Sequence, residues 1–158
     1  MNKKRIYFDM DGVLVDFESG VAKIDEATKE QYKGKLDEIP GIFALMDPIP
    51  GAAEVVRLLA RSYDVFILTT SPWNNPTAAS DKVQWVKKYM DDVFHKRLII
   101  THRKDLLDGD YLIDDRDKNG ITKVQQYFYQ VTFYQKWRVT VKMPPSYAMV
   151  NCLPVTAF

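Results

Sequence analysis

Short apolar runs of strand length recur along the chain, and the stretches between them include segments whose apolar residues follow helical spacing. Runs that are apolar at nearly every position are typical of strands buried on both faces of a parallel sheet. Strands that alternate with helices are typical of a mostly parallel sheet flanked by helices. The pattern therefore predicts an α/β fold. The predicted strands are 6–8, 64–70, 98–101 and 111–113.

Two segments have the apolar spacing of amphipathic helices. Residues 52–61 are apolar at positions 52, 55, 56 and 59, and a later stripe consists of Val83, Val86 and Met90. This spacing is close to the 3.6-residue period of a helix. Ser80 or Asp81 is expected to cap the second helix, since short polar side chains accept hydrogen bonds from the first backbone N–H groups.

Residues 17–47 interrupt this alternation. They mix apolar and charged residues, with weak helical spacing at Val21, Ile24 and Ala27. Two segments that contain Pro and Gly, 39–41 and 47–51, close this part of the chain. Such residues mark turns. We expect a small helical cap insertion over 17–47, and one core domain formed by 1–16 together with 48–158.

The pattern changes after Gly120. From Tyr127 to Met143 most odd positions are apolar and most even positions are polar. A period of two predicts one or two amphipathic strands, with a break near Gln135. A long exposed amphipathic strand would favour self-association, so a homodimer is one possible partner state.

Composition narrows the function classes. The chain has 158 residues, 46% hydrophobic and 27% charged, and a net charge of +1, which is ordinary for one globular domain and gives no general case for binding nucleic acid or an acidic membrane. A single cysteine, Cys152, excludes an internal disulfide and a Cys-rich zinc site. No segment has the length of a signal peptide or a membrane span, so a cytoplasmic location is expected.

The first strand runs into Asp9-Met10-Asp11-Gly12. On an extended chain, side chains two positions apart share a face, so Asp9 and Asp11 are expected to point the same way. Two adjacent carboxylates repel each other unless they share a cation or a proton, and Mg2+ is a hard cation that prefers such oxygen ligands. The alternative is a strand followed by an Asx-type turn, in which the aspartates only accept backbone hydrogen bonds.

Polar and charged residues also follow the other predicted strands. Ligands of open parallel sheets bind beyond the carboxyl ends of the strands, so residues at these ends should meet at one edge. Four strands therefore bring hydroxyl groups, cations and four carboxylates together. These residues are Asp9, Asp11, Thr69, Thr70, Ser71, His102, Arg103, Lys104, Asp114 and Asp115.

These residue types suit phosphoryl transfer. An aspartate can attack phosphorus, and a metal ion with a lysine can neutralise the charge that opposes the attack. Hydroxyl and N–H groups around Thr70 and Ser71 can bind the phosphate oxygens. Asp11 can protonate the leaving oxygen and later activate water.

The motifs resemble those of haloacid dehalogenase-superfamily phosphatases, with Asp9-Met10-Asp11-Gly12-Val13 first and Thr70-Ser71 second. Lys104 is the best match to the third motif and Asp114-Asp115 to the fourth. Segments 9–17, 48–52, 70–72, 81–86 and 112–116 resemble the 5′(3′)-deoxyribonucleotidases more closely. This resemblance, which covers about residues 5–120, implies a three-layer, Rossmann-like parallel sheet with a small helical cap, and a Mg2+-dependent phosphomonoester hydrolase.

The resemblance also implies residue roles. Asp9 would be the nucleophile, forming an aspartyl-phosphate, as well as a metal ligand. Asp11 would be the general acid and base and would offer its backbone carbonyl to Mg2+. Asp115 would be the direct metal ligand, with Asp114 as its close partner. The remaining residues would bind substrate: Thr70, Ser71 and Lys104 at the phosphate, Lys82 near it as a rival to Lys104, and Phe17 and Phe43 toward the base and sugar.

Two departures from the family pattern leave the substrate open. The insertion over 17–47 is shorter than expected of the animal nucleotidases, and the end of the chain after Gly120 is unlike the family's usual strand and helix. The alternating pattern there fits true β structure, a divergent ending or an altered reading frame. The preferred substrate is a (deoxy)nucleoside monophosphate. The alternatives are another phosphometabolite, such as a sugar phosphate, or a binding module without catalysis.

Overall fold

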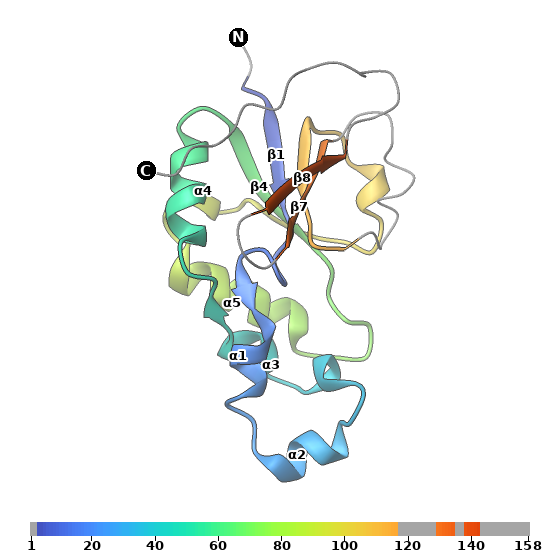
Figure 1. Cartoon of the computed structure of the whole chain (residues 1–158). Helices are drawn as coiled ribbons and strands as arrows, with labels where there is room; N and C mark the ends of the chain where they lie inside the picture. The colour runs from blue at the N-terminus through green and yellow to red at the C-terminus, as the bar shows by residue number, and fades with distance from the viewer. Residues whose placement is uncertain (1–2, 117–128, 135–137, 143–158) are drawn as a thin grey trace.

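The computed structural model of the protein describes residues 3–116, 129–134 and 138–142. A six-stranded sheet forms its centre, with the strands in the order β5-β4-β1-β6-β7-β8. Neighbouring strands are parallel from β5 to β7, whereas β8 is antiparallel to β7 (Figure 1). The strands are β1 (Arg5–Phe8), β4 (Asp64–Thr69), β5 (Leu98–Ile100), β6 (Tyr111–Ile113), β7 (Tyr129–Tyr134) and β8 (Arg138–Lys142).

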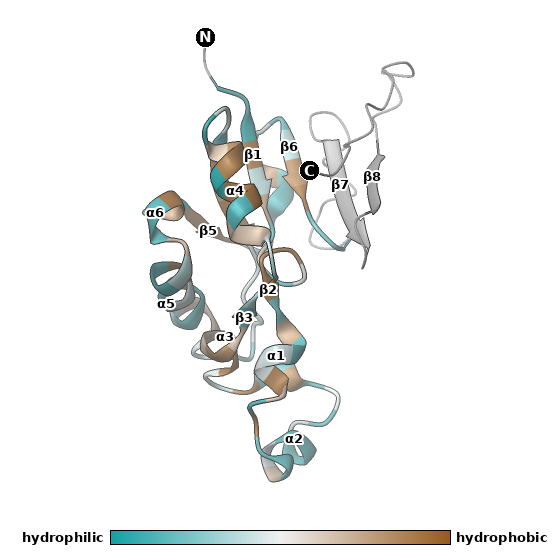
Figure 2. Ribbon diagram, turned by 60° about the vertical axis from the view of Figure 1, so that its left-hand side comes forward, coloured by the Kyte–Doolittle hydropathy of each residue, from teal (hydrophilic) through white to brown (hydrophobic). Residues whose placement is uncertain are grey.

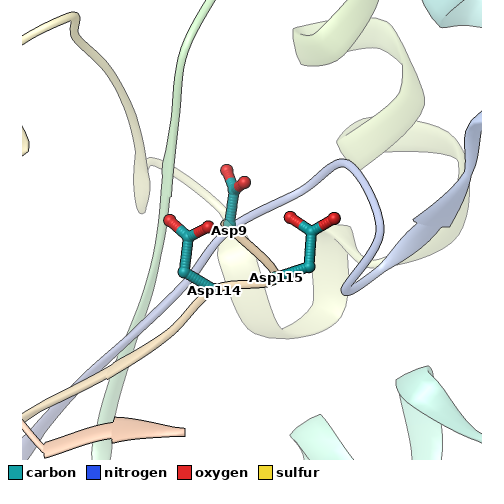
Figure 3. A group of neighbouring side chains, drawn as sticks. All are labelled: Asp9, Asp114 and Asp115. Atoms are coloured by element: carbon teal, nitrogen blue, oxygen red, sulfur yellow. The ribbon is translucent and has the colours of Figure 1, made fainter. Parts of the chain in front are cut away.

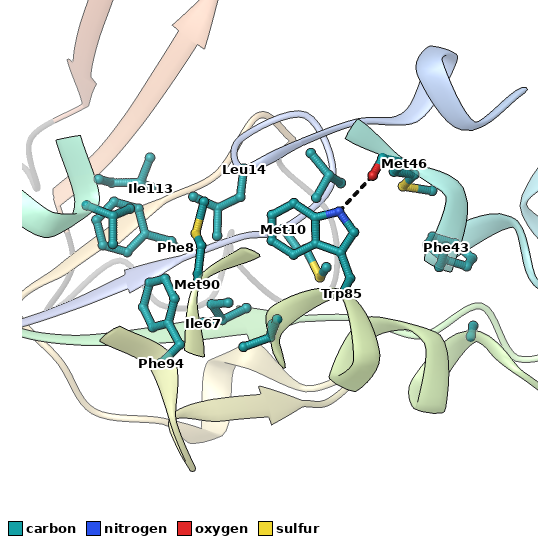
Figure 4. Close-up of a cluster of buried hydrophobic side chains, with 14 of the residues drawn as sticks. Phe8, Met10, Leu14, Phe43, Met46, Ile67, Trp85, Met90, Phe94 and Ile113 are labelled. Carbon is teal, nitrogen blue, oxygen red and sulfur yellow. Dashed lines mark hydrogen bonds between the residues drawn. The ribbon is translucent and has the colours of Figure 1, made fainter. Parts of the chain in front are cut away.

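Three helices cover one face of the sheet and enclose the main core: α4 (Ala52–Ala60), α5 (Ala78–Tyr89) and α6 (Asp91–Phe94). Figure 4 shows Phe8 and Ile67 of the strands packed near Met90 and Phe94. Trp85, which is 1% exposed, fills the space between α5 and the segment that ends at Met46, and its indole N–H donates to the Met46 carbonyl at 2.8 Å. The buried indole therefore has its one donor satisfied.

The other face of the sheet carries a smaller apolar cluster. Tyr7, Leu68 and Leu112 are its buried members, and Phe66, Ile99 and Leu107 pack against them. None of these six residues lies in a helix, although Leu107 follows the short 3-10 helix η2 (Lys104–Leu106). The described residues thus place the larger share of the core between the sheet and α4, α5 and α6.

A two-stranded antiparallel ribbon leads into and out of the segment between β1 and α4. It pairs β2 (Val15–Asp16) with β3 (Asp47–Pro48). Between them lie α1 (Phe17–Val21), α2 (Glu26–Gln31), the 3-10 helix η1 (Leu36–Glu38) and α3 (Ile42–Leu45). Both views place α2 at the end of the molecule farthest from the central sheet, and Figure 2 shows it as mainly hydrophilic. Its N-terminus is capped by Asp25, which accepts from the Thr28 N–H at 2.9 Å.

The structure confirms the predicted α/β fold, the four strands at 6–8, 64–70, 98–101 and 111–113, and the helix over 52–61. The alternating segment forms two strands, β7 and β8, separated near Gln135 as predicted; the side chains there lie outside the described residues. No described helix combines the length and apolar character that crossing a membrane requires.

The prediction for α5 was wrong in two details. The helix begins at Ala78 rather than at Ser80 or Asp81, because the Asn75 side-chain oxygen already accepts from the N–H groups of Thr77 and Ala78. The second detail is Val83, which was predicted to belong to the apolar stripe of this helix but is 38% exposed. The buried face instead includes Asp81 and Lys82, because both find polar partners inside the protein.

Candidate active site

The loop after β1 places Asp9 and Asp11 beyond the end of the strand. β1 ends at Phe8, and the N–H groups of Leu14 and Val15 turn back to the Met10 carbonyl at 2.8 and 3.0 Å. Strand alternation therefore does not relate the two aspartates, contrary to the sequence-based argument. Their carboxylates face different lysines, Lys104 for Asp9 and Lys82 for Asp11.

Three carboxylates gather where β1 and β6 end. One oxygen each from Asp9, Asp114 and Asp115 lies within 4.8 Å of the others. Figure 3 shows the three side chains rising together from the two neighbouring chain segments. The parallel pairing of β1 with β6 explains this geometry, because it brings the carboxyl ends of both strands to the same edge.

Lys104 supplies the positive charge nearest to this group. Its ammonium lies 3.1 Å from Asp9 Oδ1 and donates to Asp114 Oδ2 at 2.6 Å, and the side chain is almost completely buried. The Arg116 backbone N–H also donates to Asp114, at 2.9 Å. Asp114 is therefore the carboxylate of this group that the protein itself holds most firmly.

Lys82 reaches the site from α5. Its ammonium donates to Asp11 Oδ2 at 2.6 Å and to the Thr69 hydroxyl at 3.1 Å, and no part of its side chain is exposed. The ammonium also lies 4.6 Å from the centre of the Phe43 ring, in a cation–π arrangement. Thr69 is a buried residue at the end of β4, and its hydroxyl accepts a hydrogen bond that helps to position Lys82.

The electrostatics of the site disfavour full ionisation of the carboxylates. Burial, followed by the charge of Asp9, raises the pKa of Asp114 to about 6, against the opposing effect of Lys104. Burial also raises the pKa of Asp115 and of Asp11, and nearby cations, Arg116 and Lys82 respectively, oppose these shifts. A buried cluster of negative charge is stabilised by a bound cation.

The oxygen atoms of the cluster fit a hard divalent cation. Asp11 Oδ1 and Asp115 Oδ1 are buried and have no hydrogen-bond partner among the described residues. Unpaired buried oxygens are costly unless a ligand or water satisfies them. The donor set contains only oxygen atoms, which is the chemistry that Mg2+ and Ca2+ prefer.

A cavity of about 610 Å3 opens beside Asp11 and Arg116. This volume is within the usual range for sites that bind small molecules. Five residues predicted for the site line the cavity: Asp11, Phe17, Phe43, Thr70 and Ser71. The remaining lining residues are Gly34, Leu36, Asp37, Pro72, Trp73, His102 and Arg116.

The structure brings the ten residues predicted for the site into one region. Phe43 is only 1% exposed, so it contributes a buried wall rather than an open surface. Sequence reasoning missed the lining by Leu36, Asp37 and Arg116, and placed His102 at the same edge of the sheet without giving it a role. Arg116 directly follows the Asp114-Asp115 motif, which was the available signal for it. Leu36 and Asp37 belong to no motif, and they come close to the motif residues only in the folded chain.

Gly12 permits the close approach of the first loop to Asp115. Its φ is +76°, and a Cβ built on it would lie 2.7 Å from Asp115 Cγ. We expect Gly12→Ala to lower the affinity for Mg2+ roughly tenfold or more, since displaced or poorly supported ligands lose about 10–100-fold. The left-handed backbone would also cost about 1–2 kcal/mol of stability. Calorimetric titration with Mg2+ and thermal unfolding measure the two effects.

Gly41→Ala is the matched control. Its φ is +86°, and a Cβ there would meet nothing within 4 Å. We expect a similar loss of stability with unchanged Mg2+ affinity. Equal Mg2+ affinity in the two variants would show that contact with Asp115 is not what requires glycine at position 12.

Solved structures with the same fold are haloacid dehalogenase-like hydrolases. One from Burkholderia xenovorans LB400 has a TM-score of 0.54 at 13% identity, with 84% of this chain and 82% of that chain covered. The protein SP0104 from Streptococcus pneumoniae also has a TM-score of 0.54, at 13% identity, with coverage of 82% and 84%. The fold, including its parallel sheet, is therefore that of haloacid dehalogenase-like hydrolases, as predicted.

Sequence comparisons define the family within that fold. Residues 24–132 match the family described as 5′ nucleotidase, deoxy (Pyrimidine), cytosolic type C protein. A protein of Vibrio phage KVP40, assigned as a 5′(3′)-deoxyribonucleotidase, is 49% identical over 119 residues, which is 75% of this chain and 70% of the relative. The human 5′(3′)-deoxyribonucleotidase, cytosolic type, is 32% identical over 142 residues, with coverage of 72% and 71%. The chain belongs to the 5′(3′)-deoxyribonucleotidase family of phosphoric monoester hydrolases, in which a divalent metal ion is generally required.

Proposed function

We propose that this protein hydrolyses deoxyribonucleoside monophosphates in a Mg2+-dependent reaction through an aspartyl-phosphate on Asp9. One observation carries the proposal. The carboxylates of Asp9, Asp114 and Asp115 meet at one edge of the sheet, with Lys104 against Asp9, beside the cavity that Thr70 and Ser71 line.

Asp9 is the proposed nucleophile. One of its carboxylate oxygens forms a bond to phosphorus while the bond between phosphorus and the ester oxygen breaks. Lys104 faces Asp9 at 3.1 Å, so it can stabilise negative charge on the phosphoryl oxygens as this bond forms. Thr70 and Ser71, which lie along the cavity, hold the other phosphoryl oxygens.

Asp11 is the proposed general acid and base. In the first step its proton passes to the nucleoside oxygen that leaves. In the second step its carboxylate takes a proton from water as that water attacks phosphorus, which releases phosphate and restores Asp9. The hydrogen bond from the Lys82 ammonium to Asp11 Oδ2, at 2.6 Å, holds the Asp11 side chain in place for both steps.

Asp9, the backbone carbonyl of Asp11 and Asp115 would hold Mg2+, and Asp114 would orient the group through Lys104. The unpaired oxygen of Asp115 supports its place as a direct ligand. A bound Mg2+ would supply positive charge that offsets the repulsion between the substrate phosphate and these carboxylates.

We propose that residues 17–47 act as a cap on the core formed by 1–16 and 48–158. Phe17, Gly34, Leu36, Asp37 and Phe43 come from this segment and line the cavity. These residues would face the nucleoside from the side of the cap. A homodimer and a cytoplasmic location remain predictions from the sequence.

A panel of phosphomonoesters tests the function. Purified protein is incubated with 5′- and 3′-deoxyribonucleotides, ribonucleotides and sugar phosphates, and phosphate release is measured with Mg2+ and with EDTA. We expect release from deoxyribonucleoside monophosphates with Mg2+, and loss of at least about a hundredfold in EDTA. Both conditions are measured on the same protein sample. Phosphate release that persists in EDTA would reveal a contaminating phosphatase that needs no metal.

The same panel separates the competing functions. Turnover of a sugar phosphate alongside failure on every nucleotide would contradict the nucleotidase proposal. A folded protein that binds Mg2+ and phosphate but releases nothing from any ester would be a binding module instead.

A further inference from the structure

Trp73 stands out among the large apolar side chains of the described residues because 86% of it is exposed. A single exposed apolar residue is common on protein surfaces and needs no function by itself. Trp73, however, lines the 610 Å3 cavity that also contains Asp11, Thr70 and Ser71. Its exposed indole therefore faces the region where the substrate is expected to bind.

The turn that carries Trp73 is anchored at its end. The Asn75 N–H donates to the Pro72 carbonyl at 3.2 Å, which closes the turn around Trp73. The Asn75 side chain is 4% exposed, and its amide donates to the carbonyls of Asp37 and Ile39 at 2.8 and 2.9 Å. A turn held in this way presents the indole at low entropic cost when a ligand binds.

His102 supports the indole from the end of β5. The two ring centres are 5.6 Å apart and the ring planes meet at 71°, which is an edge-to-face arrangement. One such contact covers at most one face of the indole. Together with the exposed fraction of Trp73, this geometry leaves a flat aromatic face available to a ligand.

Phe43, another aromatic residue of the cavity, is less suited to stacking than Trp73. Phe43 is 1% exposed, and its ring is engaged by the Lys82 ammonium at 4.6 Å and lies 6.2 Å from the Phe17 ring. Trp73 follows Ser71 by two residues, so their Cα atoms lie at most about 7 Å apart. This separation suits a ligand whose planar ring is joined to its phosphate through one sugar.

We propose that Trp73 is the residue on which the base of the substrate stacks, and that His102 and Asn75 hold it in position. The inference rests on the proposed function in that it takes the ligand to be a nucleoside monophosphate. It adds a specificity-determining contact outside the motifs that carry the chemistry.

Kinetics with substituted proteins provide the first test. Trp73→Ala should raise KM for deoxythymidine monophosphate about tenfold, the usual scale for loss of one base–aromatic stack, with kcat changed less than about twofold. Trp73→Phe should restore most of the affinity. Inhibition by inorganic phosphate, which has no base, should be equal in all three proteins. Leu58→Ala is the control. It truncates an exposed apolar side chain elsewhere, on α4, and its kinetics should match those of the unsubstituted protein.

Tryptophan fluorescence provides a second readout that does not depend on turnover. In an Asp9→Asn background with Mg2+, deoxythymidine monophosphate should change the emission, and Trp73→Phe should remove this change while binding persists. Trp85 is buried and should respond little, and Trp137 lies outside the described residues. An unchanged KM in Trp73→Ala would overturn the inference. It would also be overturned if this variant lost as much affinity for inorganic phosphate as for the nucleotide. If no nucleotide is hydrolysed, the proposed function fails, while the fluorescence titration still decides whether Trp73 contacts a bound base.

Discussion

Asp9→Asn is expected to reduce phosphate release from deoxyribonucleoside monophosphates by at least about a thousandfold in kcat, since the amide has the shape of the carboxylate but is not a nucleophile. The fold should persist. Asn at this position removes one negative charge from a buried group, and Lys104 keeps its partner Asp114 at 2.6 Å. Phosphate release under saturating substrate and thermal unfolding of the same sample measure the two effects.

Asp92→Asn is the matched control for that substitution. It makes the same chemical change at a surface carboxylate of α6, which is paired with Arg57 of α4 at 2.7 Å and does not line the cavity. We expect activity close to that of the unsubstituted protein. Activity within about tenfold of normal in Asp9→Asn would show that Asp9 does not form the covalent intermediate.

Lys104→Met should have the second large effect, because it removes the ammonium between Asp9 and Asp114. We expect kcat/KM to fall about a hundredfold or more, since one preorganised group that stabilises developing charge contributes about 10²–10³. Loss of one partner of a buried ion pair costs about 3–5 kcal/mol. Stability should therefore fall in EDTA and recover partly with Mg2+, as thermal unfolding in the two conditions would show.

Lys82→Met is expected to differ from Lys104→Met in its dependence on the leaving group. Lys82 holds Asp11, and Asp11 protonates the leaving oxygen, so the loss in kcat/KM should be larger for a nucleotide than for p-nitrophenyl phosphate, whose leaving group needs no proton. Lys104→Met should slow both substrates alike. The same selectivity in both variants would contradict the separate roles given to the two lysines.

Lys29→Met serves as the control for both lysine variants. Lys29 is also paired with a carboxylate, Glu26, at 2.7 Å, but on the helix farthest from the central sheet. We expect its activity to remain normal. A surface ion pair of this kind contributes about 0–1 kcal/mol, so stability should change little.

Much of the fold was predictable because its strands are continuous apolar runs, and burial of a parallel sheet on both faces requires such runs. The start of α5 was not predictable in the same way. Asn75, which precedes the helix, accepts hydrogen bonds from the N–H groups of Thr77 and Ala78. Asp81 and Lys82 occupy the buried face because Thr77 and Asp11 provide polar partners for them. Apolar periodicity assigns charged residues to the exposed face, so it could not show this arrangement.

The site was predictable to the extent that its residues belong to motifs. Asp9, Asp11, Thr70, Ser71 and the Asp114-Asp115 pair follow strand ends, and topology alone brings such ends to one edge. The two lysines were harder to separate, since Lys82 comes from α5 and Lys104 is the first residue of the 3-10 helix η2 that follows β5. Which aspartate each lysine contacts depends on how the helices and loops that follow different strands pack together.

By itself, the sequence determined the alternation of strands and helices, the edge of the sheet at which the carboxylates gather, and the family resemblance, because each depends on residue type and order along the chain. Only the tertiary structure decided that Lys104 faces Asp9 while Lys82 faces Asp11, and that Trp73 stands exposed over the cavity. These relations join residues from different elements. They follow from how the helices and loops pack on the sheet, which no local pattern encodes.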